Sequence, residues 1–74
     1  MKINKATQKE FEEISAKNAY NNIEKKILQF CLNTFPIRDC EAFTAHYYSI
    51  LSGNYIGELS RYDKENVQYL QTII

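Results

Sequence analysis

Residues 54–74 read NYIGELSRYDKENVQYLQTII and carry the clearest helical pattern in the chain. At about 100° per residue, the apolar side chains of this stretch fall within one arc of roughly 160°. Most of its polar side chains occupy the remaining arc. The pattern therefore predicts an amphipathic helix with one side packed on the rest of the protein. The apolar arc consists of Tyr55, Ile56, Leu59, Tyr62, Val67, Tyr69, Leu70, Ile73 and Ile74.

Two polar residues, Asp63 and Asn66, fall inside this apolar arc and need an explanation. In one interpretation, Ser60 or Asp63 is an N-cap that divides the stretch into a short helical turn and a final helix. In the other, the stretch is one helix and Asn66 is a polar interface residue that sets pairing, as an asparagine does in a coiled-coil seam. The sequence favours the division and leaves the single helix open.

Four tyrosines, Tyr48, Tyr55, Tyr62 and Tyr69, recur every seven residues, which is close to two helical turns. Gly53 separates the first from the others, so the last three are predicted to form a stripe at one edge of the apolar arc. Either their rings border the core while their hydroxyl groups stay in contact with water, or they line a protein-binding surface, where tyrosines are enriched. Tyr48 is predicted to be exposed and to enlarge that surface.

Thr7 and Glu10 have the spacing of a capping box and predict a first helix from about Gln8 to Lys17. The segment before it, residues 1–6, is predicted to be a flexible N-terminus. Residues 18–22 are polar and rich in side chains that bond to their own backbone, which indicates a break or kink.

A second helix, roughly Asn22 to Thr34, has the widest apolar arc and is predicted to be the central element. In one alternative, the helix restarts near Asn21, with Glu24 at the glutamate position of a capping box. In the other, one long helix runs through the break and packs against two different neighbouring elements. Pro36 is expected to stop it.

Asp39 is predicted to be the N-cap of a third helix, Cys40 to Ser52, with Gly53 in the left-handed position at its C-terminus. The chain has 74 residues, of which 45% are hydrophobic and 24% charged, with two glycines and one proline. This balance is typical of a globular domain and favours helices over a sheet. The predicted fold is all-α, a compact bundle of four to five short helices in a single domain, residues 1–74.

Nine basic and nine acidic residues cancel, which argues against nucleic-acid binding as the main function. A helix-turn-helix is an alternative arrangement, with one helix ending at Gly53 and a second starting near Tyr55. That second helix would present Glu58, Arg61 and Lys64, which are poor phosphate anchors. A small DNA-binding regulator is therefore an alternative rather than the favoured function.

Catalytic and metal-binding patterns are not visible in the sequence. Cys31, Cys40 and His46 lack close zinc-ligand spacing, and they are predicted to be two buried thiols and a boundary histidine in a packing role. The expected protein is not an enzyme and holds no metal or cofactor. No stretch approaches the roughly 20 apolar residues of a membrane helix, and no secretory signal is visible, so a cytoplasmic location and no membrane partner are expected.

The favoured function is a protein-binding module that inhibits or regulates a larger macromolecular partner by occlusion. The size and a composition rich in isoleucine, lysine and asparagine fit an accessory protein of a phage or mobile element that acts on a host enzyme or defence complex. Acidic groups at Asp39, Glu41 and Glu58 are expected at the rim. A homodimeric structural or regulatory module is the other alternative. The predicted partner-binding residues are Tyr48, Tyr55, Tyr62, Tyr69, Asn66 and Glu58.

Overall fold

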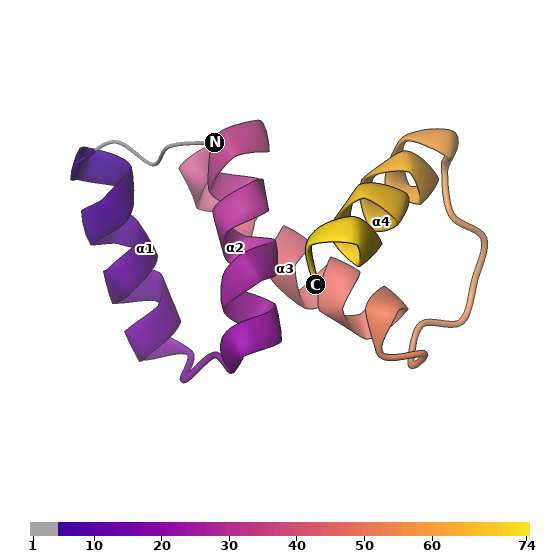
Figure 1. The fold of residues 1–74 in the computed structure, drawn as a ribbon, viewed down its shortest axis with the longest axis horizontal. Coiled ribbons are helices and arrows are strands. Elements are labelled where there is room, and N and C mark those ends of the chain that lie inside the picture. Colours follow the sequence, from indigo (N-terminus) through magenta and orange to yellow (C-terminus); the bar gives the residue numbers. More distant parts are fainter. Residues whose placement is uncertain (1–4) are drawn as a thin grey trace.

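The computed structural model describes residues 5–74, with side chains described from Gln8 onward. This part of the chain forms four α-helices and no strand, which confirms the predicted all-α bundle. Figure 1 shows α1 and α2 as an antiparallel pair, α3 crossing beside α2, and α4 at the opposite end of the molecule from α1. The bundle measures 35 × 22 × 22 Å. The helices are α1 (Lys5–Lys17), α2 (Asn22–Thr34), α3 (Ile37–Leu51) and α4 (Arg61–Ile73).

Helix α2 is the central element, as predicted, because it packs against each of the other three helices. Three of its side chains, Ile27, Leu28 and Cys31, are completely buried. Its start is fixed by a complete capping box: the Glu24 N–H donates to Asn21 Oδ1 over 2.8 Å, and the Asn21 N–H donates to Glu24 Oε1 over 3.0 Å. The restart at Asn21 is therefore confirmed, and the single long helix is wrong.

Helix α1 begins at Lys5, ahead of the predicted start at Gln8. Thr7 consequently lies inside the helix and is not its N-cap; its side chain lies outside the described residues. Lysine and alanine both have high helix propensity. Lys5 and Ala6 are therefore compatible with a helix that begins before Thr7. Residues 5 and 6 of the predicted flexible N-terminus form the start of α1. Its residues 1–4 lie outside the described residues.

The predicted break after α1 is a helix-terminating turn centred on Ala19. The Tyr20 N–H donates to the Ser15 carbonyl over 3.1 Å, and the Ala19 N–H donates to the Ala16 carbonyl over 3.3 Å. These two bonds make a Schellman motif, which requires a left-handed residue, and Ala19 has φ 51°. A Cβ is unfavourable in that conformation, so glycine would suit the position better.

Replacing the strained alanine should stabilise the protein. We expect Ala19→Gly to raise the free energy of unfolding by about 0.5–1 kcal/mol in urea denaturation, because the left-handed penalty disappears and Ala19 is exposed. Ala16→Gly, at an exposed site inside α1, is the matched control and should lower stability by about 0.5–1 kcal/mol. Equal effects of the two substitutions would contradict the left-handed assignment.

Helix α3 starts earlier than predicted, at Ile37, and Asp39 is not its N-cap. The N-cap is Pro36, whose carbonyl accepts from the Asp39 N–H over 2.9 Å, so the first turn closes directly after the proline. Asp39 lies in that turn, where a carboxylate is favourable next to the free N–H groups. The end of the helix is as predicted, because Gly53 adopts φ 78°.

The predicted helical turn over residues 54–59 is wrong, and so is the single helix over 54–74. These residues form an irregular loop, and α4 begins at Arg61. Gly57 has φ 143°, which no helix contains, and the Tyr55 ring lies against it. The predicted N-cap at Ser60 is confirmed, since its Oγ accepts from the Asp63 N–H over 3.1 Å. The second helix of the alternative helix-turn-helix therefore does not start near Tyr55.

Candidate protein-binding face

The orientation of α4 is set by a hydrogen-bonded cluster around Tyr47, whose side chain is fully buried. The Tyr47 hydroxyl donates to Asp63 Oδ1 over 2.8 Å and accepts from Asn66 Nδ2 over 2.9 Å. His46 Nε2 lies 3.4 Å from Asp63 Oδ2. Burial raises the pKa of Tyr47, and the neighbouring Asp63 adds to the effect, so the phenol stays neutral and donates its proton.

This cluster explains why Asp63 and Asn66 fall inside the apolar arc. Both satisfy the one polar atom of a buried ring that comes from α3, while Val67 and Leu70 fill the core beside them. The inward side of α4 is thus fixed by these residues. His46 is a half-buried packing residue with a hydrogen-bonding partner, as predicted.

With that side turned inward, Tyr62 and Tyr69 lie on the flank of α4 that faces the end of α2. Their rings join a continuous series of aromatic contacts. The ring centroids are 6.2 Å apart for Tyr62 and Phe35, 6.3 Å for Phe35 and Phe30, and 5.5 Å for Phe30 and Tyr69. Together with Ile73, these four residues form what is called here the α2–α4 face.

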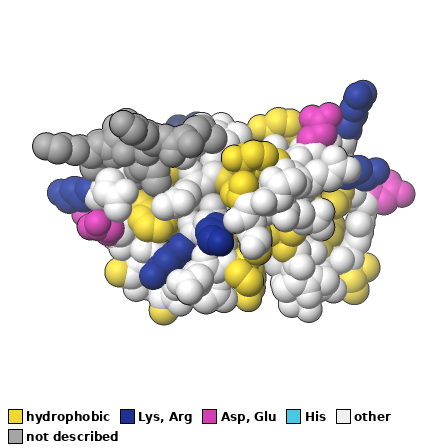
Figure 2. All heavy atoms as spheres, in the orientation of Figure 1, with side chains coloured by type: hydrophobic (Ala, Val, Ile, Leu, Met, Phe, Trp, Pro, Cys, Tyr) yellow, Lys and Arg dark blue, Asp and Glu magenta, His cyan; other side chains and the backbone are white. Residues whose placement is uncertain are grey.

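The α2–α4 face is only partly covered by the protein itself. Tyr62 is 52% exposed, Tyr69 45% and Ile73 38%, whereas Phe30 beneath them is 9% exposed. Figure 2 shows hydrophobic side chains gathered in the middle of this side of the molecule, between α2 and α4, with basic side chains beside them. Each tyrosine therefore borders the core and leaves about half of its surface exposed to solvent.

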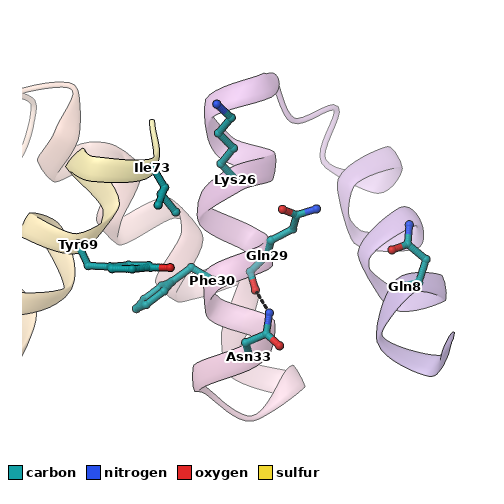
Figure 3. A pocket seen from close by; sticks show the side chains of 7 residues that line it. All are labelled: Gln8, Lys26, Gln29, Phe30, Asn33, Tyr69 and Ile73. Atoms are coloured by element: carbon teal, nitrogen blue, oxygen red, sulfur yellow. Dashed lines mark hydrogen bonds between the residues drawn. The ribbon is translucent and has the colours of Figure 1, made fainter. Parts of the chain in front are cut away.

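A groove of about 420 Å³ runs along the α2–α4 face. In Figure 3, Tyr69 and Ile73 extend from α4 toward α2, and Phe30 lies against the Tyr69 ring. The other wall is polar, and within it Asn33 Nδ2 donates to the Gln29 carbonyl over 2.8 Å. The groove is lined by Gln8, Lys26, Gln29, Phe30, Asn33, Tyr69 and Ile73.

Two of the predicted tyrosines lie elsewhere. Tyr48 is half-buried rather than exposed: its hydroxyl accepts from Asn21 Nδ2 over 3.2 Å, and its ring lines a separate hollow with Ile23 and Ile74. Tyr55 stands edge-on against His46, with ring centroids 5.1 Å apart. The predicted stripe of three tyrosines on one helix is therefore wrong, because Tyr55 belongs to the loop.

The two remaining predicted partner-binding residues are also placed apart from the face. The Asn66 side chain is half-buried and its amide is engaged by Tyr47, so it holds α4 in place. Glu58 lies in the exposed loop before α4. Of the six predicted residues, the structure brings only Tyr62 and Tyr69 together.

The two cysteines are free and completely buried between α2 and α3, as predicted. Burial raises the pKa of Cys31 to about 12, although the Thr44 hydroxyl lowers that pKa in part. Burial also raises the pKa of Cys40 to about 11. Both thiols therefore stay protonated in the folded protein under conditions in which exposed thiols ionise.

This difference predicts a loss of stability in alkali. In the unfolded chain the thiols have their ordinary pKa of 9.0, so above that pH the unfolded state binds fewer protons than the folded state. The free energy of unfolding should not be reduced by the thiols below pH 9. It should fall as the pH rises toward 11, by about 1 kcal/mol per thiol at one unit above 9. Urea denaturation across this range measures it. Cys31→Ala should flatten the decline, and an unchanged slope in that variant would contradict the assignment.

Comparison of the chain with models of protein families, with curated proteins and with solved structures finds no match. Over residues 5–74, no helix has the length and apolar character needed to cross a bilayer. The same part of the chain contains no group of three or more histidine, cysteine, aspartate or glutamate side chains placed to hold a metal ion.

Proposed function

We propose that the protein is a small helical module that binds another protein through the α2–α4 face and thereby inhibits or regulates that partner. The observation that carries the proposal is the half-exposure of Tyr62 and Tyr69 on one side of α4. Each ring packs on a phenylalanine beneath it and still exposes apolar surface that a partner could bury. Tyrosines so placed are typical of the residues that dominate interface energies.

Rigidity of the face supports the proposal. Phe30 touches Phe35 and Tyr47 as well as Tyr69, so the exposed rings rest on side chains that are themselves packed. A ring that is already held in place loses little conformational entropy when a partner covers it. The face is therefore preorganised for binding, and binding would act by occluding the partner's own surface.

The acidic rim expected from the sequence needs revision. Glu41 Oε1 is 3.5 Å from Lys17 Nζ, Asp39 borders a hollow beside Phe43 and His46, and Glu58 lies in the loop. None of these three carboxylates lines the groove. The proposed contact is consequently an aromatic face without an acidic rim.

Site-specific photo-cross-linking tests the proposal. A benzoylphenylalanine placed at position 69 or 62, in the cells that make the protein, should give an adduct with one partner of defined mass. The same group at position 55, which replaces a 38% exposed tyrosine outside the face, is the control and should give none. Equal adducts at all three positions, or none, would contradict the proposal. An adduct with the mass of two copies would assign the face to a homodimer.

A further inference from the structure

The groove on the α2–α4 face has one apolar wall and one polar wall. Tyr69 and Ile73 form the apolar wall on α4, and Lys26, Gln29 and Asn33 follow one another along α2 (Figure 3). A bound segment of chain would thus meet exposed aromatic surface on one side and side-chain hydrogen-bonding groups on the other.

The charged side chain that lines the groove belongs to Lys26. Among the residues whose side chains the structure describes, 8–74, no other charged residue lines the groove, and none of its lining residues is an aspartate or glutamate. Among the described residues, no carboxylate lies within 4.0 Å of Lys26 Nζ, whereas Lys9, Lys17 and Arg61 each have one. The ammonium group of Lys26 is exposed and free to pair with a carboxylate from outside.

The other large hollows lack this combination. The hollow between α1 and the start of α3 mixes Lys9 and Arg38 with Glu10, Glu13 and Glu41, so its charges oppose one another. Among the residues described, the hollow beside Tyr48 has no charged side chain in its lining. The hollow lined by Asp39, Ala42, Phe43 and His46 carries the opposite charge. Among these four hollows, the groove is the one whose described lining joins exposed apolar surface to a single positive charge, which selects an acidic ligand by complementarity.

We propose that the groove binds an acidic segment of the partner protein, which places an apolar side chain against Tyr69 and Ile73 and a carboxylate against Lys26. This inference rests on the proposed function and specifies the chemistry of the partner. The amide of Gln29 and the free oxygen of Asn33 offer further hydrogen bonds to the backbone of that segment, since the Asn33 nitrogen already bonds to the Gln29 carbonyl.

Peptide display on the full chain tests the inference. A library of random peptides of about 12 residues, long enough for roughly three helical turns, is selected on the immobilised protein. The selected peptides should combine an aromatic or aliphatic residue with neighbouring aspartate or glutamate. Basic or neutral sequences, or no enrichment at all, would overturn the inference.

The selected peptides are then titrated against charge variants by fluorescence polarisation. Lys26→Glu should weaken binding by about 5- to 10-fold, the size expected for one exposed charge pair turned into a repulsion. Lys25→Glu changes the net charge equally, one position away and outside the groove, and should change binding by less than about twofold. Both lysines are exposed, and circular dichroism checks that each variant keeps its helices.

Two outcomes overturn the inference in different ways. If Lys26→Glu and Lys25→Glu weaken binding equally, the ligand senses net charge and does not occupy the groove. If Lys26→Glu changes the sedimentation of the protein alone, a second copy occupies the groove. In either case an adduct from position 69 with a partner would leave the proposed function standing, whereas its absence would remove that function as well.

Discussion

Tyr69→Ala is expected to weaken binding of the cross-linked partner by about 30-fold or more, which is the effect of losing one interface residue worth about 2 kcal/mol. Tyr62→Ala should have a similar effect. Because roughly half of each ring is already in water, each substitution should lower the free energy of unfolding by only about 1 kcal/mol. Calorimetric titration measures the affinity and urea denaturation the stability.

Tyr55→Ala is the matched control for both measurements. It removes the same atoms from a tyrosine of similar exposure, but that ring packs on His46 instead of on the phenylalanines of the face. Its affinity for the partner should stay within about twofold of the native value. If Tyr62→Ala and Tyr69→Ala instead unfold the protein and leave the affinity of the folded fraction unchanged, the rings serve the core alone.

The largest effect on stability is expected at Tyr47. Tyr47→Ala removes a fully buried ring and should cost about 3–5 kcal/mol, which is comparable to the whole stability of a domain of this size. No cooperative unfolding transition should remain. Tyr47→Phe keeps the ring but leaves Asp63 and Asn66 without their shared partner, so it should cost about 1–3 kcal/mol.

Tyr48→Phe is the control for the hydroxyl. It removes an exposed bond to Asn21 and should cost less than about 1 kcal/mol. Thermal unfolding followed by circular dichroism compares the three variants. A Tyr47→Phe protein as stable as the native one would contradict the account of how α4 is oriented.

The first three helices were largely predictable because their boundaries depend on local chemistry. The capping box of Asn21 and Glu24, the stop at Pro36 and the left-handed Gly53 each act on neighbours in sequence. The misplaced starts of α1 and α3 arose where a favourable cap residue, Thr7 or Asp39, lay inside a helix whose preceding residues were also compatible with helix.

The segment before α4 could not be predicted because apolar periodicity alone does not distinguish a helix from a loop that happens to share its spacing. Ile56 fits the arc yet is 96% exposed. The position of Asp63 and Asn66 inside the apolar arc indicates that these polar side chains have a partner on the inward side of α4. That partner is the hydroxyl of Tyr47 on another helix. A partner distant in sequence is not visible in spacing.

The same reason limited the prediction of the site. Tyr62 and Tyr69 were identified from their repeat within one stretch. The groove also needs Lys26 and Gln29, which come from α2 and share no pattern with the tyrosines. Only the packing of α4 on α2 brings the two sets together.

The proposed function requires that the outward rings of α4 become covered when the partner binds. Solvent exposure of individual tyrosine rings, measured by NMR with a soluble paramagnetic probe in the free protein and in the complex, tests this requirement. The ring resonances of Tyr62 and Tyr69 should be broadened by the probe in the free protein and protected in the complex, while those of Tyr55 should be unchanged. Protection of Tyr55 with Tyr62 and Tyr69 still exposed would contradict the proposed binding face.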